Sequence, residues 1–418
     1  MLLLEEARAA ILSGVSVVGT ERVALTQAHG RVLAEPIVAP ADHPAFDNSA
    51  MDGYAVRWDE VASVSQNQTI RLPVSLEAPA GASPGVLLPG TAARIMTGGP
   101  LPKGADTVIM REDTDESEPD HVTIKALPGN GQGAHIRRQG ENIHVGQVVL
   151  EPGVLLRGGE IGLLATCGKA VVAVRRRPVV AIISTGDELV EVGQATAPGQ
   201  IINSSGYALA ALVQECGAQA RVLPIAPDEF EPTRQVFMEA LGSAELVVST
   251  GGVSVGDRDV VKDVLEALCA QLSFWKVRVK PGKPLAFGVS QQGKVPLIGV
   301  PGNPVSAYVG FWQFVRPAIL KAQGRSDWCL ARVSARLGRA VRSTQRRLDL
   351  QRGVLRADGA GGYEFMPCGD QGSGNLLSTT GINALAHIPI GVGSLEQGQQ
   401  VDVEVLYEIG AASGSDRG

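Results

Sequence analysis

The chain has 418 residues, 44% of them hydrophobic, and a formal net charge of −6. This length predicts about three domains of roughly 150 residues each. With a net negative charge and only 4% aromatic residues, the chain lacks the broad basic surface of a nucleic-acid-binding protein, so we expect no nucleic acid partner.

The cysteines and the N-terminus indicate a reducing compartment. The five cysteines are widely spaced and never form a C-x-x-C pair, which argues against a disulfide framework and against a zinc site. The first residues, M-L-L-L-E-E-A-R, lack the basic and apolar regions of a signal peptide. No apolar run is long enough to span a membrane. We therefore expect a cytoplasmic protein without a membrane partner.

The N-terminal third predicts a short helix, extended chain and then a β-rich region. Residues 4–12 have the apolar spacing and the alanine and glutamate content of a helix that ends near Gly14. Prolines and β-branched residues indicate extended chain over residues 29–44. In D-N-S-A-M-D-G-Y-A-V, residues 47–56, two acids and an asparagine crowd around a glycine; alone, this pattern is most simply a turn. From residue 57 to 145, short strands alternate with proline, glycine and asparagine.

From residue 177 onward, predicted strands and helices alternate, which is typical of a parallel sheet with helices on both faces. Asn203 or Ser204 can cap the first of these helices, and Pro304 can open the last. The expected strands cover residues 179–184, 220–225, 246–249, 274–279 and 295–300, and the expected helices cover residues 204–215, 229–241, 259–270 and 304–322.

Polar and acidic residues follow several of these strands. Ligands of open α/β sheets bind beyond the carboxyl ends of the strands, so these residues should meet at one edge. They include T-G-D-E at residues 185–188 and Asp228. After the last strand, G-V-P-G-N-P-V-S, residues 299–306, opens a helix whose first N–H groups could hold an anion.

The loop after the third strand contains more candidate ligand-binding groups than the other loops of this domain. In L-V-V-S-T-G-G-V-S-V-G-D-R-D, residues 246–259, an apolar strand runs into glycines that let the backbone approach a ligand closely. Hydroxyl groups and two carboxylates follow, and such a loop suits a phosphate group with a metal ion. An ordinary strand-to-helix turn stays the alternative for this loop alone. The residues concerned are Ser249, Thr250, Gly251, Gly252, Ser254, Gly256, Asp257 and Asp259.

Basic side chains alternate with apolar ones over residues 274–280. On one strand, Lys276, Arg278 and Lys280 would share a face, and Lys283 follows in P-G-K-P. An exposed face paired with surface acids is the usual explanation for such a strand. Here the cations lead toward the same strand ends as the acids, and we expect them to bind a multiply charged anion.

Together these patterns predict a multidomain α/β plus β protein. Helical periodicity fades after residue 324, and the polar candidates in the β structure beyond it are Arg347, Arg352 and Q-G-S-G-N, residues 371–375. We expect a discontinuous N-terminal domain (residues 1–45 and 144–176), a β-rich inserted domain (46–143), a central three-layer α/β/α domain with a mostly parallel sheet (177–324), a C-terminal β-barrel-like domain (325–410) and a disordered tail (411–418).

Six motifs occur in order along the chain: S-A-M-D-G-Y-A, R-I-M-T-G-G-P-L-P, S-T-G-D-E-L, S-T-G-G-V-S-V-G-D-R-D, K-P-G-K-P and P-G-N-P-V-S. With this set the chain resembles the molybdopterin molybdenumtransferases, the family that includes the E domain of gephyrin, over about residues 4–409. The resemblance implies a four-domain homodimer whose first domain serves dimerisation. It implies transfer of molybdate to adenylated molybdopterin with release of AMP, a divalent cation such as Mg²⁺, and molybdopterin adenylyltransferase as the upstream partner.

The motifs and the resemblance together assign roles to individual residues. Catalytic roles fall to Asp52, Thr97, Glu188, Asp228, Asp259, Lys276 and Lys280, with Glu188, Asp228 and Asp259 around the metal. Substrate contacts fall to Arg137, Ser249, Gly251, Gly252, Ser254, Gly256, Asp257, Lys283, Pro284, Pro301, Gly302, Asn303, Ser306, Arg352 and Ser373.

The chain departs from the family pattern at two places. Asn142 stands where the family more often has an aspartate, so a carboxylate is lost there. The segment R-R-L-D-L-Q-R, residues 346–352, replaces the commoner G-R-x-E-F-x-R, so Arg347 and Arg352 are approximate equivalents of the family's arginines.

Two other functions are compatible with parts of the pattern. A molybdopterin adenylyltransferase or another nucleotide-cleaving enzyme could share the α/β domain, but the motifs around Asp52 and Thr97 argue against it. A non-enzymatic scaffold could keep the fold and bind a partner peptide, as the E domain of gephyrin does. The retained acids and lysines argue against that alternative, and we expect an enzyme.

Overall fold

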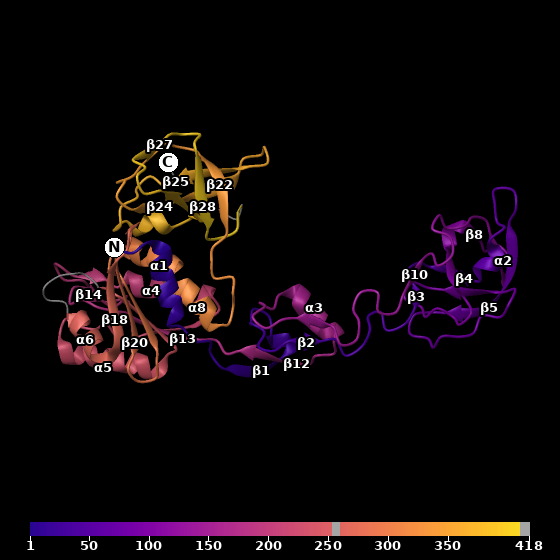
Figure 1. Ribbon diagram of the computed structural model, residues 1–418, viewed down its shortest axis with the longest axis horizontal. Coiled ribbons are helices and arrows are strands. Elements are labelled where there is room, and N and C mark those ends of the chain that lie inside the picture. Colours follow the sequence, from indigo (N-terminus) through magenta and orange to yellow (C-terminus); the bar gives the residue numbers. More distant parts are fainter. Residues whose placement is uncertain (253–259, 410–418) are drawn as a thin grey trace. The chain divides into compact units, whose positions relative to one another are not determined.

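The computed structural model describes residues 1–252 and 260–409 of the chain. The chain divides into two compact units (Figure 1). Unit 1 comprises Met1–Ala34, Pro152–Arg157 and Val171–Gly418, and unit 2 comprises Glu35–Glu151 and Gly158–Ala170. Each unit has its own sheets and core, and each is described by itself below.

A six-stranded, mostly parallel sheet forms the centre of unit 1. Four neighbouring strands run parallel, β20 runs antiparallel to both of its neighbours, and the edge strand β18 therefore runs in the parallel direction again. The strand order is β16 (Gln219–Val222), β13 (Val179–Ser184), β17 (Leu246–Thr250), β21 (Pro296–Val300), β20 (Pro284–Ser290) and β18 (Cys269–Lys276).

Helices cover both faces of this sheet because its strands are apolar on both sides. Val180 and Ile182 join one buried cluster, whereas Ala181 and Ile183 join another. The first cluster includes side chains of α1 (Leu4–Ser13), α4 (Ser204–Glu215), α7 (Pro304–Gly310) and α8 (Arg316–Ala322), and the second includes side chains of α5 (Phe230–Ser243) and α6 (Val260–Leu268). The predicted three-layer α/β/α domain is confirmed.

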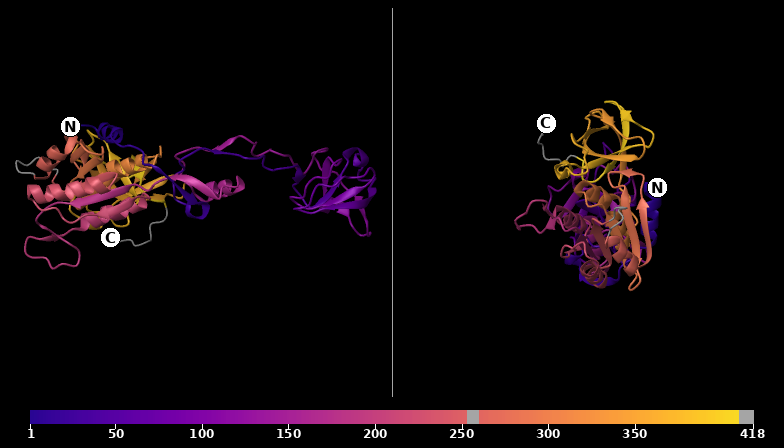
Figure 2. Two further views of the ribbon diagram at one scale, coloured as in Figure 1. Left: turned by 90° about the horizontal axis from the view of Figure 1, so that it is seen from below. Right: turned by 90° about the vertical axis from the view of Figure 1, so that its left-hand side faces the viewer.

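The C-terminal strands of unit 1 close into a barrel. Because β24 pairs with β26 as well as with β25, the ladder returns to its starting strand. The right-hand view of Figure 2 shows these strands in yellow above the α/β core. The order is β19 (Val279–Lys280), β24 (Leu348–Ala357), β25 (Tyr363–Pro367), β22 (Arg332–Leu337), β28 (Gln400–Val405) and β26 (Ala384–Ile388), so the predicted C-terminal β-barrel-like fold is confirmed.

Unit 2 contains a third six-stranded sheet, as predicted for a β-rich insertion. Its core includes Tyr54, Ile109 and Val122. The order is β7 (Thr107–Met110), β4 (Gly53–Val56), β6 (Ala92–Ile95), β5 (Ile70–Ala78), β9 (His121–Ile124) and β8 (Thr114–Asp115). Unit 2 also holds the helices α2 (Trp58–Val61) and α3 (Gly158–Thr166) and the ladders of β2 (Ile37–Val38) with β11 (Val148–Leu150) and of β3 (Asn48–Ser49) with β10 (Ile136–Arg137).

Short ladders complete unit 1, and helix α1 packs into its α/β core. Leu4 and Ile11 of α1 are buried beside the strands of the central sheet. The predicted domain boundaries remain a prediction. Within residues 1–252 and 260–409, no helix combines the length and the apolar character needed to cross a membrane. The ladders pair β1 (Thr20–Ala24) with β12 (Val171–Arg175), β14 (Leu189–Val190) with β15 (Ile201–Ile202) and β23 (Val341–Arg342) with β27 (Ser394–Leu395).

The predicted elements of unit 1 differ from the structure at three places. Strand β20 was not predicted, because it begins with a proline and contains Gly288, both of which weaken a strand pattern. The predicted strand over residues 274–280 is two elements: β18 ends at Lys276, and β19 pairs with β24 of the barrel. Lys276 and Lys280 therefore do not lie on one strand face. The helix predicted over residues 304–322 contains a π-helical segment, Phe311–Val315.

Candidate functional site

A cavity of about 760 Å³ lies at the carboxyl ends of the parallel strands of unit 1. Its lining comes mainly from turns that follow β13, β17 and β21, the place where open α/β sheets bind ligands. Eight predicted site residues line it: Glu188, Asp228, Gly251, Gly252, Pro284, Pro301, Gly302 and Asn303. The structure therefore brings these eight residues together at one edge of the sheet, and their roles remain a prediction.

Backbone packed against backbone forms part of the cavity wall. Gly251 has a φ of 95°, and a Cβ atom there would lie 2.7 Å from the carbonyl oxygen of Thr185. A Cβ atom on Gly302 would lie 3.4 Å from the Cα of Gly251. Glycine is thus required at residue 251 by both conformation and space, and main-chain atoms stay accessible to a ligand.

Two of the three predicted metal-binding acids line this cavity. Glu188 and Asp228 are both exposed, and the backbone N–H of Asp228 donates to Oδ1 of Asp187 at 3.0 Å. That hydrogen bond holds the turn after β13 beside the turn that carries Asp228. The third acid, Asp259, lies outside the described residues, as do Ser254, Gly256 and Asp257. Among the described residues, no cluster of three or more histidine, cysteine or acidic side chains could hold a metal ion.

An apolar wall of the cavity was missed from the sequence. Ile201 and Ile202 of β15 line the cavity, and they are 57% and 46% exposed. The parallel ladder with β14 holds them, and the N–H of Ile201 donates to the carbonyl of Glu188 at 2.8 Å. In the sequence, the only local indication of this wall is the pair of adjacent isoleucines directly before the helix cap at Asn203. Exposed apolar side chains beside acids suit a ligand that has both a flat ring and charged groups.

Asn203 lines the same cavity and was predicted only as a helix cap. Its Oδ1 accepts a hydrogen bond from the N–H of Gly206 at 3.1 Å, which confirms the cap, and another from Oγ of Ser184 at 2.9 Å. Asn203 is 1% exposed, and its Nδ2 is buried without a hydrogen-bond partner among the described residues.

The turn before α7 contacts the C-terminal barrel. Nδ2 of Asn303 donates to Oγ of Ser373 at 3.3 Å, and the N–H of Val305 donates to the carbonyl of Ser373 at 3.2 Å. The expectation that the first N–H groups of this helix hold an anion is therefore wrong for Val305, because its amide is already paired. Ser306, in the first turn of α7, is 4% exposed and does not line the cavity.

None of the predicted lysines lines the cavity, although Lys276 and Lys283 adjoin the cavity residue Pro284. Lys276 is exposed at the carboxyl end of β18, where it pairs in register with Pro284, a cavity residue. Lys283 is exposed and precedes β20. Lys280 is partly buried, and its Nζ donates to Oδ2 of Asp349 at 3.1 Å.

Two predicted substrate contacts are buried inside the fold. Ser249 is fully buried within β17, and Arg352 is fully buried in the barrel. Nε of Arg352 donates to Oγ of Ser378 at 3.1 Å, and its Nη2 donates to the carbonyls of Asp370 and Gly372 at 3.2 Å each. Burial lowers the pKa of Arg352. Arg352 thus braces the loop that carries Ser373, and neither buried side chain is open to the cavity.

Unit 2 contains a second cluster of predicted residues. Oδ1 of Asp52 accepts hydrogen bonds from the N–H of Thr97 at 2.7 Å and from its Oγ1 at 2.8 Å. The hydrogen bond from the Thr97 backbone is the main cause that lowers the pKa of Asp52. Both residues are exposed, and Arg137 is exposed on β10.

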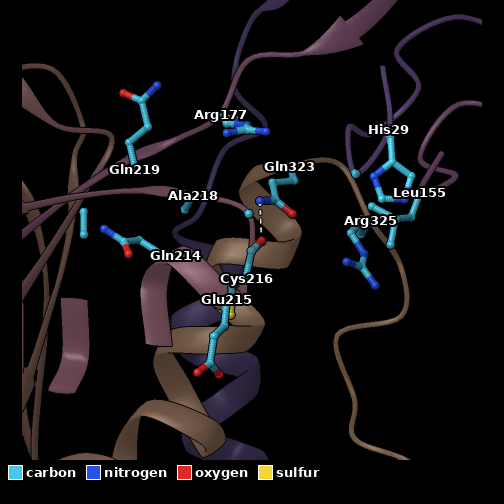
Figure 3. Close-up of a pocket in the computed structure, with 13 residues that line it drawn as sticks. His29, Leu155, Arg177, Gln214, Glu215, Cys216, Ala218, Gln219, Gln323 and Arg325 are labelled. Carbon is cyan, nitrogen blue, oxygen red and sulfur yellow. Dashed lines mark hydrogen bonds between the residues drawn. The ribbon is translucent and has the colours of Figure 1, made fainter. Parts of the chain in front are cut away.

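A second cavity of unit 1, of about 680 Å³, lies at the opposite ends of the strands (Figure 3). Arg177, which precedes β13, and Gln219, which begins β16, line it. Some of its polar side chains are paired: Gln323 Nε2 donates to the carbonyl of Cys216 at 2.8 Å (Figure 3), and Nε of Arg325 donates to Oδ1 of Asp327 at 2.7 Å. The carboxyl-end cavity is the better candidate, because it is lined by glycine turns and by two acids that form no ion pair with any described residue.

Comparisons with known proteins cover almost the whole chain. The MoeA N-terminal region (domain I and II) matches residues 2–168, a probable molybdopterin binding domain matches residues 181–321, and the MoeA C-terminal region (domain IV) matches residues 334–406. The molybdopterin molybdenumtransferase of a Nostoc species is 40% identical over 91% of this chain and 88% of its own length. That of Haemophilus influenzae is 38% identical over 97% of this chain and 98% of its own length. The chain belongs to the molybdopterin molybdenumtransferase family.

Solved structures of the family agree with the fold. A molybdopterin biosynthesis MoeA protein from Pyrococcus horikoshii is 32% identical, with a TM-score of 0.81 over 98% of this chain and 100% of that one. Another crystal structure of MoeA from the same species is 29% identical, with a TM-score of 0.83 over 97% of this chain and 100% of that one.

The two departures from the family pattern have clear places in the structure. Asn142 is exposed, and its N–H donates to the carbonyl of His43 at 3.1 Å, a main-chain hydrogen bond that does not depend on a carboxylate at residue 142. Arg347 lies directly before β24, and its Nη1 donates to the carbonyl of Val279 at 3.4 Å. The segment that departs in sequence therefore holds the chain beside Lys280.

Proposed function

We propose that this protein is a molybdopterin molybdenumtransferase: it takes adenylated molybdopterin and molybdate, releases AMP and leaves molybdenum on the dithiolene of molybdopterin. The observation that carries the proposal is the cavity at the carboxyl ends of the strands, where Glu188 and Asp228 face glycine turns and an apolar wall. A nucleotide-linked substrate with phosphate groups and flat rings matches this combination. The relatives named molybdopterin molybdenumtransferase support the same activity.

Mg²⁺ fits the donors on this cavity. Proteins commonly hold Mg²⁺ through one or two carboxylates while substrate phosphates supply further oxygens, and Glu188 and Asp228 provide two such carboxylates. We assign these residues, with Asp259, to the metal. A bound Mg²⁺ would neutralise charge that develops on phosphate oxygens when AMP leaves.

The chain's own residues bind and orient the two substrates. The turns at Gly251 and Gly302 let phosphate oxygens approach main-chain atoms, and Ile201 and Ile202 offer an apolar surface to a ring. Molybdate is a dianion, and Lys276, Lys280 and Lys283 supply positive charge near the same edge of the sheet. We assign molybdate to the region between these lysines and the turn that carries Pro301 and Asn303.

The protein acts as a homodimer in this proposal. Asp52 and Thr97 form a polar pair in unit 2, which is compact in its own right, and the site of each chain would take this pair from its partner. Mixing Asp52→Ala chains with Glu188→Ala chains should then restore part of the activity in heterodimers, since one of the two sites would be intact. Absence of rescue in verified heterodimers would contradict a shared site.

The substrate determines the remaining assignments. Adenylated molybdopterin must come from an adenylylating reaction, so a molybdopterin adenylyltransferase is the upstream partner that we propose. Because such an intermediate would be made and used in one compartment, we assign the protein to the cytoplasm.

A direct assay tests the proposed function. Purified protein is incubated with adenylated molybdopterin, molybdate and Mg²⁺, and AMP is measured by chromatography. We expect AMP release that depends on molybdate and stops when Mg²⁺ is chelated. AMP release that is equally fast without molybdate would instead indicate a nucleotide-cleaving enzyme, and no release from folded protein would contradict the proposal.

A further inference from the structure

Asp349 is a buried acid of the barrel that lies in the segment R-R-L-D-L-Q-R, residues 346–352, and has no role assigned from the sequence. It lies on β24 and is 2% exposed. Burying a carboxylate is unfavourable unless it is paired with a cation or with hydrogen-bond donors. Its cationic partner is Lys280, whose Nζ lies 3.1 Å from Oδ2 of Asp349. A lysine that the sequence predicted to bind the anion is thus held by a buried acid on the neighbouring strand of the barrel.

The backbone around this pair is fixed as well. Strand β19 pairs in parallel with β24, with Val279 opposite Leu348 and Lys280 opposite Asp349. The N–H of Leu348 donates to the carbonyl of Arg278 at 2.9 Å. The chain leaves the central sheet at Lys276, the end of β18, and pairs with the barrel from Val279 onward, so both the main chain and the side chain of Lys280 are anchored to β24.

The lysine stays accessible although its partner does not. The side chain of Lys280 is 31% exposed, whereas that of Asp349 is 2% exposed. A free lysine side chain has about 2 kcal/mol of rotamer entropy. An acid that fixes the ammonium in advance removes part of this cost from ligand binding, which is how preorganised sites gain affinity.

We propose that Asp349 is a positioning residue that holds the ammonium of Lys280 ready for the molybdate oxyanion. The inference rests on the proposed function, in which Lys280 binds molybdate. Asp349 itself is buried and acts through Lys280. The barrel thus contributes to the site through two paired strands, since β19 carries Lys280 and β24 carries Asp349.

A double-mutant comparison tests this role. We expect Asp349→Asn to lower kcat/KM for molybdate about tenfold, because Lys280 loses its fixed partner, with the KM for adenylated molybdopterin unchanged. Lys280→Ala should lower kcat/KM for molybdate further. The double variant should have the same kcat/KM as Lys280→Ala, because Asp349 affects molybdate binding only through Lys280. Effects that add in the double variant, or an unchanged kcat/KM in folded Asp349→Asn, would overturn the inference.

Glu404→Gln is the matched control. Glu404 is also 2% exposed and belongs to the same barrel, but its partners are Gln313, Arg332 and His387. We expect this variant to lose stability while kcat/KM per folded molecule stays unchanged. An equal loss of kcat/KM in both variants would mean that Asp349 matters only for the fold.

A crystal structure of Asp349→Asn separates this inference from the proposed function. We expect Lys280 Nζ to leave its wild-type position in the variant, whatever reaction the protein catalyses. If Lys280 keeps that position, the positioning role is wrong even when AMP release is observed. If Lys280 moves but the wild-type protein releases no AMP, the proposed function fails and the positioning role stands.

Discussion

The open cavity of unit 1 and the buried polar network around Glu404 both contain carboxylates, but these carboxylates differ in burial and in their hydrogen-bond partners. In the network, Arg8 of α1 donates to both the carbonyl and Oε1 of Gln313, and Gln313 Nε2 donates to Glu404 at 2.7 Å. Arg332 donates to the other carboxylate oxygen, and the imidazole of His387 lies 3.2 Å from Glu404. The carboxylate of Glu404 is thus paired on both oxygens.

The acids of the cavity lack such partners. Glu188 and Asp228 are exposed, and no ion pair joins either to a cation among the described residues. A carboxylate that is fully paired stabilises the fold and leaves little capacity for a ligand. A carboxylate that is exposed beside glycine turns contributes little to stability and can bind a cation or a substrate. Burial and pairing, more than residue type, distinguish the structural acid Glu404 from the acids that we propose bind the metal.

The largest effect that we predict follows from replacing Glu188. Glu188→Gln keeps the shape and removes the charge, so AMP release should fall about 100-fold or more, in the range seen when one electrostatic group is removed from an active site. Because the side chain is exposed, the free energy of unfolding should change by less than about 0.5 kcal/mol. Initial rates at several Mg²⁺ concentrations and a urea titration measure the two quantities.

Glu215→Gln provides the control for that experiment. Glu215 is an exposed glutamate that lines the second cavity and accepts a hydrogen bond from the hydroxyl of Tyr407 at 2.9 Å. Its replacement should leave AMP release unchanged. Wild-type rates and wild-type Mg²⁺ dependence in Glu188→Gln would remove Glu188 from the proposed site.

The second prediction concerns the pH dependence of stability. Burial alone raises the pKa of Glu404, but His387, Gln313 and Arg332 together lower it from 4.5 to about 2. A tenfold change in proton affinity corresponds to about 1.4 kcal/mol, so ionised Glu404 contributes about 3 kcal/mol to folding. This contribution is fully present above pH 4.5 and is lost as the pH falls toward about 2.

Urea titrations between pH 7 and pH 2 measure this contribution. The Glu404→Gln variant should be less stable than wild type at pH 7, and the difference should shrink as the pH falls below 4.5. Asp402→Asn is the matched control, because Asp402 is exposed on the same strand. A difference between wild type and Glu404→Gln that stays constant down to pH 2 would show that the charge of Glu404 does not stabilise the fold.

The sequence predicted local elements well where several signals agreed. The strand predicted at residues 179–184 coincides with β13, because a continuous apolar run is typical of a strand buried on both faces. The cap at Asn203 is observed, because asparagine directly before a helix commonly caps it. The alternation of basic residues over residues 274–280 was misleading. Periodicity continues across a point where the chain changes sheets, and only the pairing of β19 with β24 shows the change.

The partners of individual side chains could not be predicted. Lys280 and Asp349 are 69 residues apart in sequence, and nothing local to either one identifies the other. Arg352 was assigned a substrate contact from its motif, yet the barrel encloses it, and its Nη2 donates to carbonyls of the loop that carries Ser373. Pairing and burial depend on tertiary structure, which is why the edge of the sheet was predictable and its supporting contacts were not.

The smallest effect that we predict concerns Asn203. This residue is buried and hydrogen-bonded like the residues of the Glu404 network, and it also lines the open cavity. Asn203→Ala removes the acceptor for the N–H of Gly206, and loss of a helix cap costs about 1 kcal/mol. Asn203→Ser keeps a capping oxygen and should recover at least half of that loss. Ser204→Ala is the control, since Ser204 lies inside α4. Urea titrations measure the free energy of unfolding of the three variants, provided that the m-value is the same as in the wild type. If alanine and serine at residue 203 destabilise the protein equally, Asn203 contributes through packing and not through the cap.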